Sequence, residues 1–132
     1  MNPISKNLIW SSIYLYLRAI PNWRKINEHS FTYPRNIFDF SRVCVGKMSY
    51  GELNVVIESK ENAKLIIGDY CSIAPNTTFL LDAEHTTRTI STYPFKVLKF
   101  QQDKEAGTKG DIKIKSDVWI EMNCTICSGI TI

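Results

Sequence analysis

The fold is decided by two stretches that carry an apolar residue at every sixth position, IGDYCSIAPNTTF at residues 67–79 and IKSDVWIEMNCTICSGITI at residues 114–132. Neither the helical period of about 3.6 residues nor simple strand alternation selects every sixth residue. Repetition at a short fixed period is typical of a solenoid, in which each repeat buries its apolar residue against its neighbours. The members of this column are Ile67, Ile73, Phe79, Ile114, Ile120, Ile126 and Ile132.

A second column, four residues further along each hexad, supports the same period. Where this column is expected to have the least room, it holds the small residues Cys71, Thr77 and Cys124. Gly68 and Ala74 come directly after the apolar column, and residues this small suit a corner where the chain turns.

These columns predict an all-β solenoid in which three hexads make one triangular coil. We expect short parallel strands over residues 61–80 and 112–132, with Ile67, Ile73, Ile120 and Ile126 pointing inward. An ordinary β-sandwich with coincidental spacing is the alternative. Residues 82–111 keep no period, and a long segment of this kind inside a repeat is usually functional or disordered. We therefore divide the chain into a helix and lead-in segment, 1–42, and a solenoid domain, 43–132, with a long loop at 82–111.

The apolar stretch LIWSSIYLYL at residues 8–17 is too short to span a membrane, which takes roughly 17–25 residues. No small-residue cleavage site follows it, so we do not interpret it as a signal peptide. We predict a helix over residues 4–20 that is apolar over most of its circumference. Such a helix either packs on a partner surface, which we favour, or lies at a membrane interface.

The charge pattern favours a solvated surface over a nucleic-acid interface. The formal net charge is +3, and acidic residues interrupt the basic ones between residues 99 and 115, whereas nucleic-acid binders concentrate positive charge on one face. The four cysteines, with no secretory signal, are expected to be free thiols in a reducing cytoplasm. Cys124 and Cys127 form a Cys-x-x-Cys pair without two further ligands at compatible spacing, so we predict no metal site.

The segment IGDYCSIA at residues 67–74 resembles the hexad opening of the xenobiotic acetyltransferase branch of the hexapeptide-repeat acyltransferases. That branch includes chloramphenicol and streptogramin acetyltransferases and O-acetyltransferases of surface polysaccharides. In the family, a loop histidine, a Tyr-Pro-Phe, a Gly-Asp-Ile and a Val-Trp-Ile follow in this order. The matching segments here are Glu84-His85, Tyr93-Pro94-Phe95, Gly110-Asp111-Ile112 and Val118-Trp119-Ile120, and VGKMSYG at residues 45–51 resembles the first coil. The resemblance covers about residues 23–132.

The resemblance implies a left-handed parallel β-helix assembled as a homotrimer, with acetyl-coenzyme A bound between subunits. It implies that His85 is the general base, because a neutral imidazole titrates near the working pH and can take the proton of an attacking hydroxyl. Trp119 matches the family tryptophan near the coenzyme, and the alternative is that it fills a corner of the solenoid. His29 matches nothing and is expected to be structural. The side chains expected to orient the histidine or contact the acceptor are Tyr50, Asp82 and Glu84.

The acceptor expected first is a hydroxyl of a sugar or surface polysaccharide, and an antibiotic is the alternative. A catalytically dead solenoid fragment is the third possibility. The family continues with further coils beyond the position of Ile132, and it carries small residues where Glu121, Met122 and Asn123 stand. On this basis the chain is expected to be truncated at its C-terminus and to bind acetyl-coenzyme A weakly.

Overall fold

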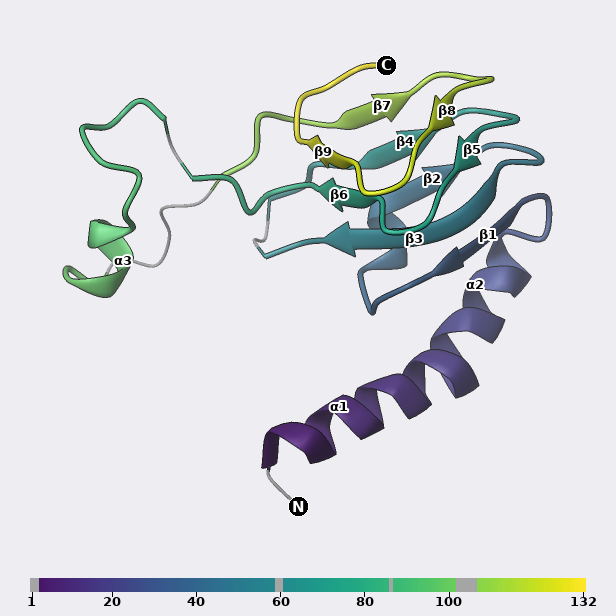
Figure 1. Ribbon diagram of the computed structural model, residues 1–132, viewed down its shortest axis with the longest axis horizontal. Helices are drawn as coiled ribbons and strands as arrows, with labels where there is room; N and C mark the ends of the chain where they lie inside the picture. The colour runs from purple at the N-terminus through teal and green to yellow at the C-terminus, as the bar shows by residue number, and fades with distance from the viewer. Residues whose placement is uncertain (1–2, 59–60, 86, 102–106) are drawn as a thin grey trace.

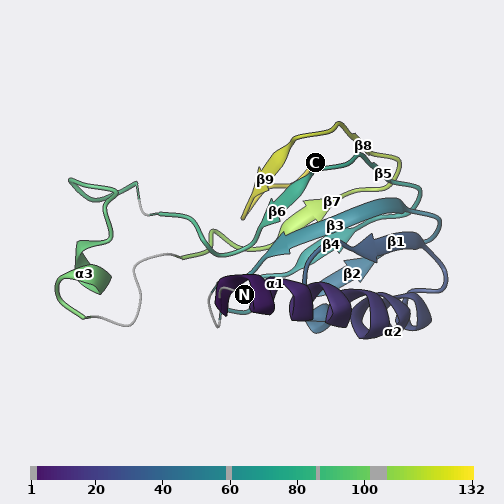
Figure 2. The ribbon, with the colours of Figure 1, turned by 60° about the horizontal axis from the view of Figure 1, so that its bottom comes forward.

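The computed structural model describes residues 3–58, 61–85, 87–101 and 107–132. It consists of a body of stacked parallel strands, an N-terminal helix and a long loop that stands away from the strands (Figure 1). The second view shows the helix as a layer on one side of the strands (Figure 2).

Every pairing between the named strands is parallel, as the hexad pattern predicted for residues 61–80 and 112–132. One sheet has the order β2-β4-β7, and the other has the order β8-β5-β3-β6-β9, with β1 beside β3. The strands are β1 (Phe31–Pro34), β2 (Val43–Val45), β3 (Tyr50–Val56), β4 (Leu65–Ile67), β5 (Ser72–Ile73), β6 (Thr78–Leu80), β7 (Ile112–Ile114), β8 (Trp119–Ile120) and β9 (Thr125–Cys127).

The last two layers of strands keep one constant offset. β4 pairs with β7, β5 with β8 and β6 with β9, and the partners are 47 positions apart in each pair, as in Leu65↔Ile112 and Thr78↔Thr125. Because the offset does not change, the residues that interrupt the hexad pattern all lie between β6 and β7. That segment contains the long loop and its short helix α3 (Phe95–Leu98).

The predicted inward column forms the centre of the core. Six of its members, Ile67, Ile73, Phe79, Ile114, Ile120 and Ile126, are at most 5% exposed. Cys71 and Thr77 of the second column are fully buried. Ile132, the last member of the column, is 46% exposed. Its segment lies beside β7 at the end of the stack, where its backbone bonds to Lys113 and Lys115.

The corners differ in detail from the prediction. The chain adopts a left-handed conformation at Tyr70 and Asn76, two residues after the small residues Gly68 and Ala74. Gly68 is needed for a different reason, since a Cβ on it would lie 2.6 Å from the backbone nitrogen of Ser116 in the next layer. Gly68 therefore permits close stacking of successive layers, and the chain turns two residues later, at Tyr70.

Strand β3 explains why the hexad pattern is not visible upstream of residue 61. Its start pairs with β5 (Tyr50↔Ser72) and its end with β6 (Asn54↔Thr78). The partner strands are six residues apart, whereas the two positions on β3 are four residues apart, so this layer has no full corner. Gly51 lies at the crossing point with φ +119°.

We expect Gly51→Ala to lower the free energy of unfolding by about 1–3 kcal/mol, because the left-handed backbone disfavours a side chain there. In addition, the new Cβ would lie 2.1 Å from the carbonyl oxygen of Ile73. Gly107→Ala is the matched control, since nothing lies within 4 Å of its added Cβ. Denaturant unfolding measures both variants, and equal stabilities would show that the crossing in β3 tolerates a side chain.

The N-terminal helix is longer than the predicted 4–20. It comprises α1 (Pro3–Tyr14), the π-helical turn η1 (Leu15–Ala19) and α2 (Ile20–Ile26). Proline lacks the N–H that a helix interior needs, and Pro21 lies in the first turn of α2, directly after the wider turn. At that junction Ile20 N donates to Leu15 O five residues back. Within the described residues, no helix has the length and apolar character needed to cross a bilayer.

Helix α2 covers the first layer of strands through Trp23, which is completely buried. The indole Nε1 donates to Thr32 Oγ1 of β1 at 3.1 Å. Its ring packs edge-on against Phe38 and Phe40, with centroid distances of 5.7 and 5.0 Å. The lead-in segment thus adds both a strand and an aromatic cluster to the body.

Candidate active site

The loop that carries the predicted histidine begins at a buried ion pair. Asp82 comes two residues after β6, and its side chain has no exposed surface. Its Oδ2 lies 3.1 Å from Arg42 Nη2, at the end of the 3-10 turn η2 (Phe40–Arg42), and its Oδ1 accepts a 2.6 Å bond from Glu58 N. The Arg42 Nε donates to Ala63 O at 2.8 Å. Asp82 therefore ties the start of the loop to two earlier segments, and no surface of this side chain is left to contact an acceptor.

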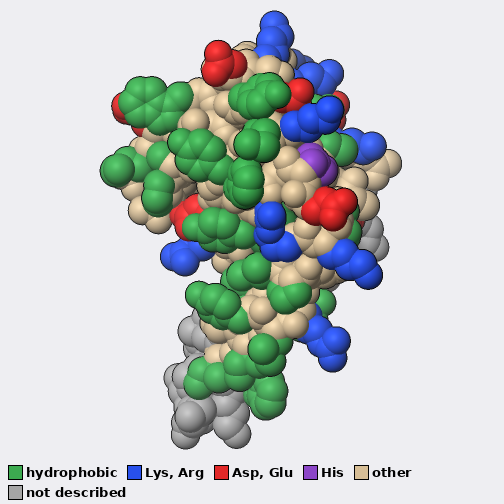
Figure 3. Space-filling view, turned by 90° about the vertical axis from the view of Figure 1, so that its right-hand side faces the viewer, with side chains coloured by type: hydrophobic (Ala, Val, Ile, Leu, Met, Phe, Trp, Pro, Cys, Tyr) green, Lys and Arg blue, Asp and Glu red, His purple; other side chains and the backbone are tan. Residues whose placement is uncertain are grey.

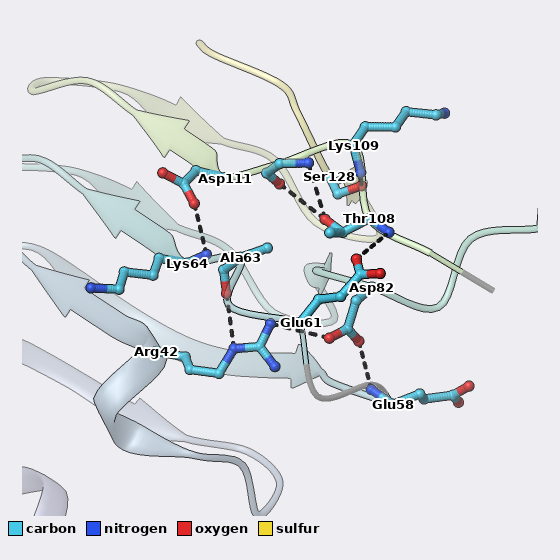
Figure 4. A network of polar contacts seen from close by, with 11 residues as sticks. Arg42, Glu58, Glu61, Ala63, Lys64, Asp82, Thr108, Lys109, Asp111 and Ser128 are labelled. Carbon is cyan, nitrogen blue, oxygen red and sulfur yellow. Dashed lines mark hydrogen bonds and ion pairs between the residues drawn. The ribbon is translucent and has the colours of Figure 1, made fainter. Parts of the chain in front are cut away.

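The returning end of the loop is held by a second set of bonds, seen next to Asp82 in Figure 4. Each of these bonds joins a backbone N–H to a side-chain oxygen of a different segment. They run from Thr108 N to Glu61 Oε2 (3.1 Å), from Lys109 N to Ser128 Oγ (2.8 Å) and from Lys64 N to Asp111 Oδ1 (2.9 Å). Both ends of the loop are thus fixed to the strand body.

Glu84, next to the predicted histidine, joins the two ends to each other. Its Oε1 accepts bonds from Ser128 N (2.7 Å) and Ser128 Oγ (2.8 Å), and its Oε2 lies 2.6 Å from Lys109 Nζ. Its backbone carbonyl accepts a bond from Gly107 N at 3.1 Å. The Glu84 side chain is 11% exposed. In this chain the Glu84 side chain is therefore engaged in positioning the loop.

The electrostatics of Glu84 favour its charged form. Burial by itself raises the pKa of this carboxyl, but the hydrogen bonds from Lys109 and Ser128 and the Lys109 charge outweigh burial. The pKa of Glu84 is therefore lowered from its usual 4.5. The same contact raises the pKa of Lys109, through the hydrogen bond and then the charge of Glu84.

A group with a lowered folded-state pKa stabilises the fold fully above its unfolded pKa, and this contribution is lost as the pH falls through the folded pKa. We therefore expect the wild-type chain to lose stability below about pH 4.5 more steeply than Glu84→Gln, which has no carboxylate to protonate. Denaturant unfolding at neutral and acid pH measures the two slopes. Glu121→Gln, at an exposed position after β8, is the control and should follow the wild type. Identical slopes for all three proteins would show that the charged Glu84 carboxylate does not stabilise the fold.

His85 is exposed, and its orientation is set by one contact to the loop. Its Nδ1 lies 2.8 Å from the carbonyl oxygen of Thr92. Because a carbonyl can only accept, Nδ1 carries the proton of this bond. The neutral ring then has its lone pair at Nε2, which is the form a general base needs.

A cavity of about 450 Å³ lies beside His85. Its volume is within the range of small-molecule sites in proteins. The lining residues come from both ends of the loop and include two cations: Glu84, His85, Thr87, Arg88, Gly107, Thr108 and Lys109. The site therefore combines a base with a cavity whose lining includes Arg88 and the ion pair of Glu84 and Lys109.

Tyr50 and Trp119 lie on a different surface of this chain. In the sheet register, Tyr50 of β3 aligns with Ser72 of β5, and Ser72 with Trp119 of β8. Two strand spacings correspond to about 10 Å. Both rings face outward, 53% and 70% exposed. In Figure 1, β8 lies at the right, whereas the loop leaves the strands at the left. Within one chain, Trp119 and Tyr50, which were predicted to contact the coenzyme and the acceptor, therefore lie away from His85.

The second histidine makes a comparable contact within the strand body. His29 Nε2 donates to Val45 O at 2.8 Å, and its own carbonyl accepts a bond from Met48 N. These contacts join the turn before β1 to the end of β2. In the part of the chain that the structure describes, no three His, Cys, Asp or Glu side chains are grouped as metal ligands, and the four cysteines are free thiols.

The sequence analysis missed Arg42, Lys109, Ser128 and the Thr92 carbonyl. Only Ser128 left a signal in the sequence. It stands 47 positions after Leu81, and this polar residue therefore occupies a core position that is apolar in the previous layer. The other three are contacts between segments with no repeating spacing, and no pattern in the sequence indicates them.

A base beside a cavity, on a loop that is fixed at both ends to a body of parallel strands, is an arrangement suited to group transfer without a covalent intermediate.

No family model matches the chain. The chain is similar to three acetyltransferases. It is 41% identical over 74 residues to a probable macrolide acetyltransferase of Lysinibacillus sphaericus, and the match covers 51% of this chain and 41% of that protein.

The other two matches are of the same kind. The chain is 41% identical over 52 residues to virginiamycin A acetyltransferase of Staphylococcus aureus, covering 39% of this chain and 24% of that protein. It is 33% identical over 76 residues to chloramphenicol acetyltransferase of Agrobacterium fabrum, covering 52% and 36%. The matched region is therefore less than half the length of each of these relatives.

Proposed function

We propose that this protein transfers an acetyl group from acetyl-coenzyme A to a hydroxyl group, with His85 as the general base. The proposal rests on the bond from His85 Nδ1 to Thr92 O, which keeps the neutral ring in the tautomer with a lone pair at Nε2. Nε2 takes the proton of the acceptor hydroxyl while its oxygen attacks the thioester carbonyl. The carbon–sulfur bond then breaks, and the imidazolium returns the proton to the coenzyme thiolate.

The proposed acceptor is a hydroxyl-bearing antibiotic. The sequence analysis placed a sugar or polysaccharide first, but the names of the similar proteins refer to a macrolide, virginiamycin and chloramphenicol. They support the antibiotic alternative rather than the sugar. The cavity beside His85 has room for part of such a molecule together with the acetyl thioester.

We further propose that the stacked strands of residues 43–132 are coils of a left-handed β-helix, preceded by the lead-in segment 1–42. The constant offset of 47 positions between the last two layers supports this architecture. In this proposal three copies assemble so that Trp119 and Tyr50 of one copy face the loop of another. Support comes from the exposed apolar side chains of the loop, among them Ile90, Tyr93, Phe95, Leu98 and Phe100.

The direct test is to incubate the protein with acetyl-coenzyme A and, separately, chloramphenicol, virginiamycin and a macrolide. Release of free coenzyme thiol should depend on one of these antibiotics, and mass spectrometry should find one acetyl group added to it. An amino sugar and a neutral oligosaccharide serve as further acceptors. Acetylation of a sugar alone would contradict the proposed acceptor, and no thiol release with any acceptor would contradict the activity.

A further inference from the structure

One side of the N-terminal helix packs on the strands. Ala19 and Trp23 are buried, and Ser12 and Leu15 line a cavity together with the segment after β1. These positions recur at intervals of three and four residues, which places them on one side of the helix. Figure 2 shows the helix as an outer layer, so its far side faces away from the strands.

The far side is apolar and aromatic. In the space-filling view, hydrophobic side chains follow the lower part of the molecule, where the helix leaves the strands, and no acidic side chain is visible there (Figure 3). The exposed large hydrophobic side chains of the described part of α1 and η1 are Ile9 (46%), Trp10 (68%), Ile13 (40%), Tyr14 (53%), Tyr16 (70%) and Leu17 (68%), and of these Tyr16 also lines the cavity next to Ser12 and Leu15. Soluble proteins rarely leave so continuous an apolar surface without a partner.

The net positive charge of the protein comes from its N-terminal segment. Residues 1–27 contain four Lys or Arg residues and no Asp or Glu, whereas the rest of the chain contains twelve basic and thirteen acidic residues. Arg18 and Lys25 are exposed and lie beside the apolar surface, lining one cavity with Tyr14 and Leu17. Asp39 also lines that cavity, where it accepts bonds from Ser41.

We propose that this helix binds the surface of an anionic phospholipid bilayer and lies parallel to it. The apolar side chains enter the boundary between headgroups and acyl chains, and the tryptophan and tyrosine rings occupy the headgroup level. The basic side chains attract anionic headgroups. A second copy of the helix is a poorer occupant, because it would bring two positively charged surfaces together. The sequence analysis favoured packing of the helix on a partner surface. In the structure, the side of the helix with Ala19 and Trp23 packs on the protein's own strands.

Sedimentation of the full chain with vesicles tests the proposal. We expect it to sediment with vesicles of equal parts phosphatidylglycerol and phosphatidylcholine, and much less with phosphatidylcholine alone. Binding should weaken in about 1 M salt, where charges are screened beyond about 3 Å. The double variant Arg18→Gln/Lys25→Gln should lower the partition coefficient by roughly 30-fold, at about fivefold for each charge. Trp10→Ser/Leu17→Ser should also reduce binding, through the lost apolar contact.

The matched control is Lys113→Gln/Lys115→Gln, which removes two exposed charges from β7 and its turn and should leave vesicle binding unchanged. Far-ultraviolet circular dichroism checks that all variants are folded. Equal loss in the control and in Arg18→Gln/Lys25→Gln, or no binding to anionic vesicles, overturns the proposal. So does a lower assembly mass of Trp10→Ser/Leu17→Ser by light scattering without vesicles, since the surface would then belong to another copy. None of these readouts depends on acetyl transfer.

Discussion

Replacing His85 with alanine is expected to lower the turnover of acetyl transfer by about 10²–10⁴-fold, the range found for loss of a general base. The substitution removes the lone pair at Nε2, so the acceptor hydroxyl must attack with its proton still attached. Because the side chain is exposed and lies on the loop, we expect the stability of the strand body to change little. The measurement is the initial rate of coenzyme thiol release at saturating substrates.

His29→Ala is the matched control, because His29 also uses one ring nitrogen to bond a backbone carbonyl. We expect it to retain most of the turnover. Equal losses of rate in the two variants would mean that the roles of the histidines are wrongly assigned.

Replacing Asp82 with alanine is expected to lower the free energy of unfolding by about 3–5 kcal/mol, because it leaves the Arg42 charge buried without its carboxylate. The Arg42 side chain is 10% exposed, and Asp82 is completely buried. The Glu58 N–H loses its acceptor as well. Denaturant unfolding measures the loss. Glu121→Ala, at an exposed position, should stay within about 0.5 kcal/mol of the wild type.

The double variant Arg42→Met/Asp82→Leu separates stability from substrate binding. Replacing both charges with apolar side chains of similar volume should recover much of the stability that Asp82→Ala loses, because no isolated charge remains. Since Asp82 has no exposed surface, we expect the double variant to keep the wild-type KM for the acceptor. A raised KM in this folded variant would show that Asp82 contacts the acceptor, as the sequence had suggested.

The strands could be predicted because every hexad places its apolar residue in the same environment. Ile73 and Ile120 face one core from adjacent layers, so the same physical demand recurs along the chain and leaves a visible period. The layer that contains Gly51 omits a corner, so its residues do not keep the period of six. A single departure from a period cannot be recognised in the sequence, and the course of β3 could therefore not be predicted.

The candidate site was predicted only in part. His85 could be singled out because it stands in the unpatterned loop next to recognisable segments. The contact with Thr92 that sets its tautomer could not, since it involves a backbone carbonyl, which every residue has. The ion pair of Arg42 and Asp82 joins residues forty positions apart that belong to no repeat.

The sequence by itself determined the parallel strands, the inward column, the long loop and the histidine within it. Each of these depends on a residue's own chemistry or on a repeated spacing. Only the tertiary structure decided which face of the N-terminal helix is free, how Glu84 and Asp82 hold the loop, and that Trp119 lies apart from His85 in one chain. Those features arise from single contacts between distant segments, and such contacts form only when the stacked strands bring the segments together.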